Sequence, residues 1–451
     1  TEDHEMQQRS REELALVENA RRVMPAGGFG NVSSDIIIRD GRDGRVWDES
    51  GNEYIDYMLG AGPMLIGHAH PEVNEAVHEQ IAHGTGFFMN NRHGIALAEA
   101  IVEAVPCAEQ VRFVCTGTEA VAYAIRLVRA FRKRDKILKF EGGFHGTSDA
   151  TLMSFAPRTL SNFPEGVPDS AGIPQGVRDD ILVAPYNDID AFAGMLREYA
   201  DVLAGVLMEP VQRVIPPKPG FLEGVRELTT RHDVPLVFDE ICTGFRLAYG
   251  GALAYYGVVP DVCTLGKVLG GGYPLAAIAG REDIMAHFDA TRVGPDEHLL
   301  QLGTLSGNPI AARAGLATLE VLRRPGTYER LYATGERLMQ GLTERLAEQR
   351  IEATVVGLPP WFDAVFARGP IENYRDVLPG SAETERFNAL LLERGVLKGK
   401  TRYAVSTAHT EQDVADTLDA WSSALAALSA ESSANLIHAG AIDRSNRRNT
   451  I

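Results

Sequence analysis

The sequence contains few cysteines, four in 451 residues. Cys107, Cys115, Cys242 and Cys263 are far apart along the chain, and none belongs to a C-x-x-C pair. Disulfide frameworks and structural zinc sites both need paired or clustered cysteines. We therefore expect four reduced thiols in the core of a cytoplasmic protein, without a disulfide or a zinc site.

Basic residues are also in short supply. Lys and Arg number 44 against 61 Asp and Glu, so the formal net charge is −17 at pH 7. Nucleic-acid binding depends on clustered cations that neutralise phosphates. The strongest basic cluster, residues 126–136, is interrupted by Asp135 and is typical of the solvated C-terminal end of a helix, where cations suit the dipole. The sequence therefore predicts no nucleic-acid partner.

Long apolar runs are missing as well. The chain has no run of about 18 apolar residues, the length that a membrane span requires. The first seven residues have neither the basic nor the apolar region of a signal peptide. We expect no membrane association and a cytoplasmic location.

The chain does contain a long alternation of strand-like and helix-like segments, which indicates an α/β fold with a mostly parallel sheet. The expected strands are residues 111–114, 136–140, 181–184, 202–208, 235–238, 262–265 and 275–279, and the expected helices are residues 117–133, 189–198 and 221–232. In such sheets ligands bind at the carboxyl ends of the strands.

The two ends of the chain have a different pattern. The N-terminal part predicts a helix over residues 9–24 and a hairpin over residues 44–57. The C-terminal part predicts helices over residues 311–323, 328–348, 382–394 and 410–428. We expect an N-terminal segment (1–60) that packs with a smaller α+β domain (313–430), a large domain (61–312) and a polar tail (431–451) without an assigned fold.

Lys267 and Asp239 stand out as a chemical pair. Each follows an apolar strand-like run, and Lys267 is succeeded by three glycines, residues 270–272. Desolvation lowers the pKa of an amine and makes the free base available as a nucleophile. An amine and an acid at the ends of two strands are the pair needed to hold pyridoxal phosphate, through its aldehyde and its pyridine nitrogen.

Two histidines, His68 and His70, raise the question of a metal site. No third ligand is evident nearby, and Pro71 is typical of the start of a helix. We predict structural packing there and no metal.

Seven short stretches match one family in its order and spacing. They are Gly-His-Ala-His-Pro (67–71), Thr-Gly-Thr-Glu-Ala (116–120), Phe-Glu-Gly-Gly-Phe-His-Gly (140–146), Glu-Pro-Val (209–211), Phe-Asp-Glu-Ile-Cys-Thr-Gly-Phe-Arg (238–246), Gly-Lys (266–267) and Gly-Thr-Leu-Ser-Gly-Asn-Pro (303–309). The chain resembles the class III, fold-type I pyridoxal-phosphate aminotransferases, nearest the glutamate-1-semialdehyde aminomutase branch. The resemblance runs from about residue 54 to 312, and more weakly to about 418. It implies a seven-stranded large domain.

The resemblance implies the cofactor roles of the two central residues and of a helix start. Lys267 would bond covalently to the cofactor and then move a proton at the substrate carbon, and Asp239 would pair with the pyridine nitrogen. Gly117 and Thr118 open a helix after a strand, a place that suits a phosphate dianion, although a plain helix cap has the same pattern.

Further positions carry over from the same resemblance. Phe144 and Ile241 would pack on the two faces of the cofactor ring, and His145 would orient the ring or serve structure alone. Glu209 belongs to the cofactor-binding set. Thr304 would reach the phosphate in the neighbouring subunit, which implies a homodimer with shared active sites.

The substrate half of the pattern departs from the aminomutase branch. The branch's carboxylate-binding arginine is absent from residues 25–34, and its glutamate is absent from residues 84–93. Phe87 instead suggests an apolar pocket mouth. Arg213 or Arg402 would serve as a carboxylate clamp, although a surface position is the commoner setting for either.

These features predict a dimeric aminotransferase. It would move an amino group from an amine or amino-acid donor, including donors with a large apolar part, to a keto-acid or aldehyde acceptor by ping-pong chemistry. An aminomutase of the glutamate-1-semialdehyde type, a racemase and a decarboxylase stay open, since all share one starting chemistry. A P-loop is excluded because Asp261 replaces its first glycine, and a dehydrogenase fingerprint, G-x-G-x-x-G, is lacking before residue 117.

Overall fold

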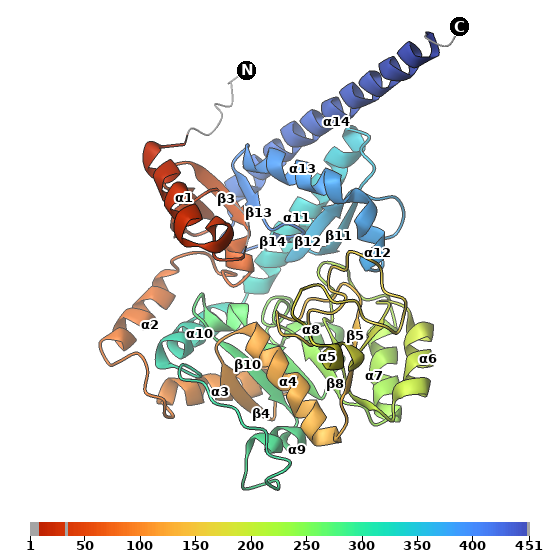
Figure 1. Ribbon diagram of the computed structural model, residues 1–451. Helices are drawn as coiled ribbons and strands as arrows, with labels where there is room; N and C mark the ends of the chain where they lie inside the picture. Colours follow the sequence, from red (N-terminus) through yellow and green to blue (C-terminus); the bar gives the residue numbers. More distant parts are fainter. Residues whose placement is uncertain (1–8, 32–34, 449–451) are drawn as a thin grey trace.

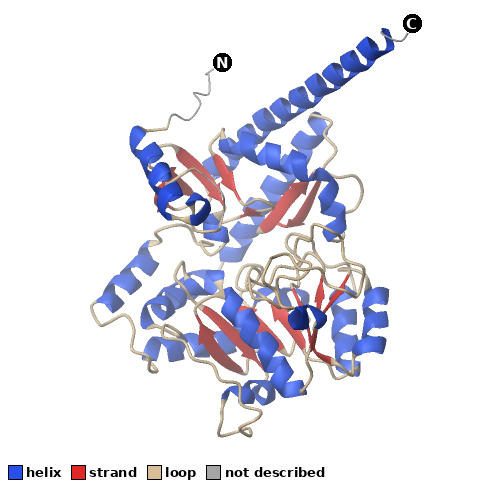
Figure 2. Ribbon diagram, in the orientation of Figure 1, coloured by secondary structure: helices blue, strands red, loops and turns tan. Residues whose placement is uncertain are grey.

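The computed structural model describes residues 9–31 and 35–448, and the side chains of residues 432–448 are not described. The expectations for the first seven residues therefore lie outside the described part. Figure 1 shows a large sheet flanked by helices below, and two smaller sheets with the long last helix above. The helices lie on both faces of the large sheet (Figure 2).

The large sheet has seven strands in the order β4-β10-β9-β8-β7-β5-β6. Strands β5 to β9 pair in parallel, and β10 is antiparallel to both β4 and β9. The strands are β4 (Gln110–Val114), β5 (Lys136–Phe140), β6 (Ile181–Ala184), β7 (Leu203–Met208), β8 (Leu236–Asp239), β9 (Val262–Leu265) and β10 (Ala276–Gly280). The predicted α/β class with a mostly parallel sheet is confirmed.

Continuous apolar runs form the central strands because helices cover both faces of the sheet. Every residue of β7 is buried. The helices of this part are α2 (Pro71–Ile81), α3 (Arg92–Ala104), α4 (Gly117–Arg132), α5 (Gln175–Asp179), α6 (Ile189–Tyr199), α7 (Phe221–Arg231), α8 (Gly251–Tyr256), α9 (Glu282–Met285) and α10 (Pro309–Leu322). Helix α3 was not among the predicted elements.

Of the two smaller sheets, one combines strands from both ends of the chain and the other is built from the C-terminal part alone. The four-stranded sheet comprises β1 (Ile38–Arg42), β2 (Arg45–Asp48), β3 (Glu53–Tyr57) and β13 (Val396–Lys398). The three-stranded sheet comprises β11 (Thr354–Leu358), β12 (Trp361–Val365) and β14 (Tyr403–Ala404). β3 and β13 pair in parallel, so backbone hydrogen bonds join the N-terminal hairpin to the C-terminal part.

Helices complete the upper part: α1 (Arg11–Val23), α11 (Thr327–Glu348), α12 (Tyr374–Val377), α13 (Ser381–Leu392) and α14 (Glu411–Arg448). We call the part from β11 onward the C-terminal lobe. Helix α14 continues beyond residue 428, where we expected it to end, and projects from the body in Figure 1. The domain boundaries proposed from the sequence remain predictions.

The cysteine prediction is partly wrong. All four cysteines are free, but only Cys107 and Cys263 are buried in the core. Cys115 and Cys242 are half-buried because they lie just beyond strand ends, in the turns that follow β4 and β8. Among the described residues, no helix has the length and apolar character to cross a membrane.

Trp421 anchors α14 to the three-stranded sheet. Its ring is fully buried, its Nε1 donates to Tyr403 Oη at 2.9 Å, and the two rings meet edge to face. Trp421→Ala should lower the free energy of unfolding by about 3–5 kcal/mol through the cavity it leaves. Urea denaturation measures this, with the exposed Val202→Ala as a control expected to change it by under about 0.5 kcal/mol. A loss in Trp421→Ala no larger than the control's would contradict the anchor.

Candidate active site

Lys267 opens a short 3-10 turn, Lys267–Gly270, two residues after β9 ends. Its φ of 49° lies in the left-handed region, which non-glycine residues seldom adopt. Its Nζ donates to Cys242 Sγ at 2.7 Å. The amine is therefore presented, half-buried, at the carboxyl edge of the large sheet.

Asp239 ends β8, the parallel neighbour of β9, where it pairs with Thr264. Its carboxylate accepts hydrogen bonds from the Ile241 N–H at 3.1 Å and from Thr264 Oγ1 at 3.3 Å. His145 Nδ1 lies 2.8 Å from the other carboxylate oxygen. These three contacts fix the acid at the strand edge that also presents Lys267.

His145 is buried, and its second ring nitrogen, Nε2, has no partner among the described residues. Asp239 holds Nδ1 and so fixes the plane of the imidazole. Both roles that the sequence left open for His145, orientation of the ring and a structural role, remain predictions.

Helix α4 begins next to these residues, and its start is well ordered by a capping box between Thr116 and Glu119. The cap satisfies the Glu119 N–H, whereas the N–H groups of Gly117 and Thr118 have no intrahelical partner by helix geometry. Thr118 Oγ1 accepts from the Thr147 N–H at 3.2 Å and keeps its own proton to donate. Such a helix start suits an anion.

Ile241 and Phe144 are both half-buried near this helix start. Added β-carbons at Gly117 and Gly266 would lie 3.2 and 3.0 Å from the Ile241 side chain, so it packs against both glycines. The Phe144 N–H donates to Glu209 Oε2 at 3.0 Å, and its ring meets Phe155 at 4.8 Å between centroids. Glu209 thus holds the backbone that carries Phe144.

Neither candidate arginine is a surface residue. The Arg213 guanidinium lies over the Phe144 ring at 5.5 Å, and its Nη1 is 3.8 Å from Glu209 Oε1. The Arg402 guanidinium stacks on Trp361 at 4.8 Å, and its buried Nη1 has no partner among the described residues. Burial lowers the pKa of Arg402. The surface alternative is therefore wrong, because Arg213 packs on Phe144 and Phe155, and Arg402 packs on Trp361.

Phe87 and Thr304 are not brought to this cluster within one chain. Both lie on exposed loops that approach each other, with Asn91 Nδ2 donating to the Gly307 carbonyl at 2.7 Å. Neither makes a hydrogen bond or a ring contact with the cluster around Lys267, as far as the structure describes the chain. The two loops expose six large apolar side chains: Phe87, Phe88, Met89, Leu300, Leu302 and Leu305.

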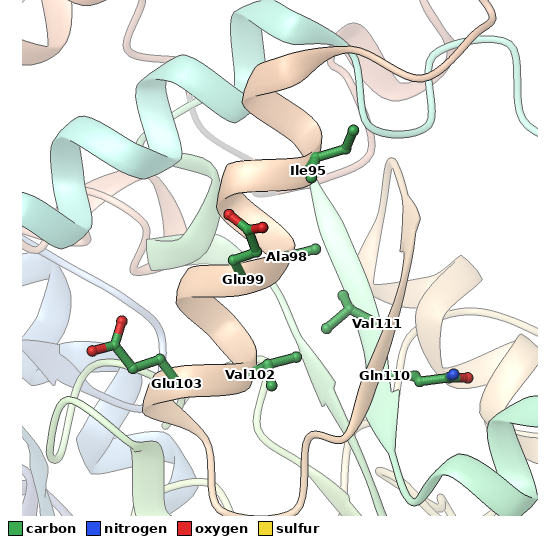
Figure 3. Close-up of a pocket in the computed structure, with 7 residues that line it drawn as sticks. All are labelled: Ile95, Ala98, Glu99, Val102, Glu103, Gln110 and Val111. Atoms are coloured by element: carbon green, nitrogen blue, oxygen red, sulfur yellow. The ribbon is translucent and has the colours of Figure 1, made fainter.

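A surface groove of about 550 Å³ lies elsewhere, between α3 and β4. Its lining residues are Ile95, Ala98, Glu99, Val102, Glu103, Gln110 and Val111 (Figure 3). It contains none of the predicted site residues. His68 bonds Asp56 at 2.7 Å, and no group of three or more His, Cys, Asp or Glu side chains that could hold a metal occurs in the described residues.

The sequence did not single out three residues of the site. Cys242 lies within a matched stretch but was expected in the core, although it contacts Lys267. Arg246 ends the same stretch, and its almost wholly buried guanidinium lies 4.8 Å from the Trp361 ring. The matched stretch contains Cys242 and Arg246, but only long-range packing brings Trp361 to them.

Comparisons with known proteins agree with this geometry. A sequence model described as aminotransferase class-III matches residues 29–358. The chain belongs to the class III aminotransferases. It is 39% identical over 404 residues to a glutamate-1-semialdehyde 2,1-aminomutase of Natranaerobius thermophilus, which spans 87% of this chain and 92% of the relative.

Two solved structures are similar over most of the chain. An ω-transaminase from Sphaerobacter thermophilus has a TM-score of 0.88 and 34% identity, covering 92% of this chain and 97% of the other. A transaminase with pyridoxal phosphate bound has a TM-score of 0.86 and 31% identity, covering 94% and 99%. The cofactor of this enzyme family is pyridoxal 5′-phosphate.

The residues present fit this cofactor. His145 Nε2 has no partner among the described residues, and the first N–H groups of α4 are open. Ile241 packs against Gly117, where α4 begins, and against Gly266, next to Lys267. This donor set offers an amine, a carboxylate and a phosphate-binding helix start, one for each functional group of the cofactor.

Glu240, beside Asp239, fixes the turn that carries Ile241 and Cys242. It is fully buried and accepts from the N–H groups of Ala252 and Leu253 at 2.9 and 2.7 Å. Desolvation raises the pKa of Glu240 to about 7.

This pKa predicts a pH dependence of stability. Because the folded pKa of about 7 exceeds the ordinary 4.5, the folded state binds the proton more tightly between these values. Below pH 4.5, Glu240 contributes up to about 3 kcal/mol to the free energy of unfolding. This contribution is lost as the pH rises to 7. The difference in unfolding free energy between wild type and Glu240→Gln, measured by urea denaturation across this range, should follow that trend. A difference that stays constant with pH would contradict the buried, protonated Glu240.

Proposed function

We propose that the protein is a pyridoxal-phosphate-dependent aminotransferase that moves an amino group from an amine or amino acid to a keto acid or aldehyde by ping-pong chemistry. The observation that carries this proposal is the placement of Lys267 and Asp239 at the ends of two adjacent parallel strands. The absence of the aminomutase branch's substrate arginine and glutamate favours transamination over internal rearrangement. We also infer a cytoplasmic location from the few, free cysteines.

Lys267 is the proposed catalytic base. Pyridoxal phosphate, when bound, supplies an aldehyde that receives amino groups and a ring that withdraws electrons from the substrate carbon. Lys267 Nζ holds the cofactor covalently at rest, and as a free amine it takes and returns the proton at the substrate carbon. The contact with Cys242 keeps the amine within the site.

Asp239 is proposed to keep the pyridine nitrogen protonated through its negative charge. His145 and the N–H of Ile241 fix the carboxylate in one orientation. Phe144, Ile241 and Glu209 are proposed to position the ring, and Gly117 and Thr118 to bind the phosphate through N–H groups and a hydroxyl.

Thr304 and Phe87 are proposed to act across a homodimer. Both lie on the two loops that expose six large apolar side chains, a concentration typical of an interface. A partner subunit would bring these loops to the neighbouring site, with Thr304 at the phosphate and Phe87 at the pocket mouth.

The proposed substrates carry a carboxylate near an apolar part. Arg402 is the better clamp, since its buried Nη1 has no partner in the described part of the chain, whereas Arg213 already faces Glu209. The rings of Phe144, Phe155 and Trp361 line the same region through their arginine contacts. Aminomutase activity remains the second candidate because of the 39% identity to the Natranaerobius enzyme.

Lys267→Ala should abolish the visible absorbance of the lysine-bound cofactor and reduce multiple-turnover transamination by at least about 10⁴-fold, since both covalent anchor and base are lost. Absorbance spectra and coupled assays with pyruvate and 2-oxoglutarate measure this.

Asp239→Ala should bind the cofactor weakly and lose most activity. Full turnover in Lys267→Ala, or wild-type turnover in Asp239→Ala, would overturn the assigned roles.

Arg402→Ala should discriminate between donors. For amino acids, kcat/KM should fall by about 10²-fold, as expected for loss of a charged hydrogen-bonding pair. For amines without a carboxylate it should change little. Arg213→Ala serves as the matched variant and should affect carboxylate donors less. Glutamate semialdehyde without any keto acid belongs in the donor panel, because its turnover would favour the aminomutase.

A further inference from the structure

Arg375 connects the C-terminal lobe to the large sheet. It lies in α12 and its Nε donates to Glu141 Oε2 at 2.7 Å, while its Nη2 donates to Glu141 Oε1 at 3.1 Å. The same Nη2 donates to the Ser161 carbonyl at 2.7 Å, and the guanidinium lies 4.5 Å from the Phe163 ring. Two parallel hydrogen bonds make this the strong, directional form of an arginine–carboxylate pair.

Glu141 is the first residue after β5 and is only 3% exposed. Besides Arg375, its carboxylate accepts the Ser161 N–H at 3.1 Å. Its carbonyl accepts Gln212 Nε2 at 2.7 Å. Without the guanidinium, a buried carboxylate would keep few hydrogen-bond donors, which is costly enough to displace it.

The chain that follows Glu141 leads directly to Phe144 and His145. Gly142 has φ of 87°, and a β-carbon there would lie 2.5 Å from Tyr374 Cβ, so the Tyr374 side chain of α12 lies directly against this turn. Residues 141–145 are therefore held from one side by the C-terminal lobe, and by Glu209 and Asp239 from the other.

Separate contacts dock α12 itself. The Glu372 carbonyl accepts Asn187 Nδ2 at 2.8 Å, and its carboxylate pairs with Lys218 Nζ at 2.5 Å. A capping box between Asn373 and Asp376 closes the helix start. Loss of the Arg375 side chain would therefore leave α12 in place and remove its contacts with Glu141, the Ser161 carbonyl and the Phe163 ring.

We propose that Arg375 is a positioning residue: through its ion pair with Glu141 it makes the orientation of Phe144 and His145 depend on docking of the C-terminal lobe. This inference rests on the proposed contacts of Phe144 and His145 with the cofactor. Arg375 itself acts only through Glu141 and needs no contact with the cofactor.

The test compares the full-length protein with Arg375→Ala, Arg375→Lys, Glu141→Gln and the double variant Arg375→Ala/Glu141→Gln. Cofactor-free protein is titrated with pyridoxal phosphate, and the visible circular dichroism per bound cofactor is recorded at saturation. Arg375→Ala and Glu141→Gln should each raise the cofactor Kd at least tenfold and halve the dichroism. Arg375→Lys should lie between these variants and wild type.

The matched control is Arg368→Ala, in the same lobe, whose partner Glu352 is exposed and whose Kd should stay within threefold of wild type. The cofactor Kd of the double variant should not exceed the higher Kd of the two single variants, since each single variant already breaks the same ion pair. Kd values within threefold and unchanged dichroism in Arg375→Ala and Glu141→Gln would overturn the inference, as would additive effects. If Arg375→Ala does not fold, Arg375→Lys and Glu141→Gln decide by the same criteria.

Failure of the Arg375 inference can be told apart from failure of the proposed function. If wild type and Arg368→Ala both bind the cofactor and show the absorbance that depends on Lys267, the proposed function stands, whatever the Arg375 variants show. Wild type without that absorbance would overturn both.

Discussion

Strands β8 and β9 run side by side in the same direction, with Asp239 opposite Thr264. Because parallel strands end at the same edge of a sheet, the acid that ends β8 and the lysine that follows β9 leave the sheet together. Thr264 Oγ1 also donates to Asp239, so the strand pairing itself orients the carboxylate. Everything else in the site, from His145 to the start of α4, is arranged around this pair.

Buried charge surrounds that edge, and the structure satisfies it with backbone groups. Lys139 is fully buried in β5, and its Nζ donates to the carbonyls of Gly143, Thr151 and Met153 at 3.1, 3.3 and 2.5 Å. Burial lowers the pKa of Lys139 to about 8. Burying a charge is costly unless hydrogen bonds compensate, so this lysine fixes the loop that follows Phe144 and His145.

The C-terminal lobe supplies the less conventional part of the site. Trp361, Arg375 and Arg402 all follow residue 358, where the match to the family ends. Arg402 stacks on Trp361, and Trp361 Nε1 donates to the Arg213 carbonyl at 2.7 Å, so the lobe and the large sheet share these contacts. In the proposed function, Lys267 and Asp239 bind the cofactor from the large sheet, whereas Arg402 binds the substrate carboxylate from the C-terminal lobe.

Local sequence pattern determined the order of strands and helices, the mostly parallel sheet and the pairing of Lys267 with Asp239, because apolar periodicity and short motifs act over neighbouring residues. It missed helix α3, and it named Arg213 and Arg402 as carboxylate clamps without deciding between that role and a surface position. Only the tertiary structure decided that Cys242 contacts Lys267, that Arg402 is buried on Trp361 and that Arg375 binds Glu141. The partners in these contacts come from separate elements of the chain, up to 234 positions apart for Arg375 and Glu141, so only packing brings them together.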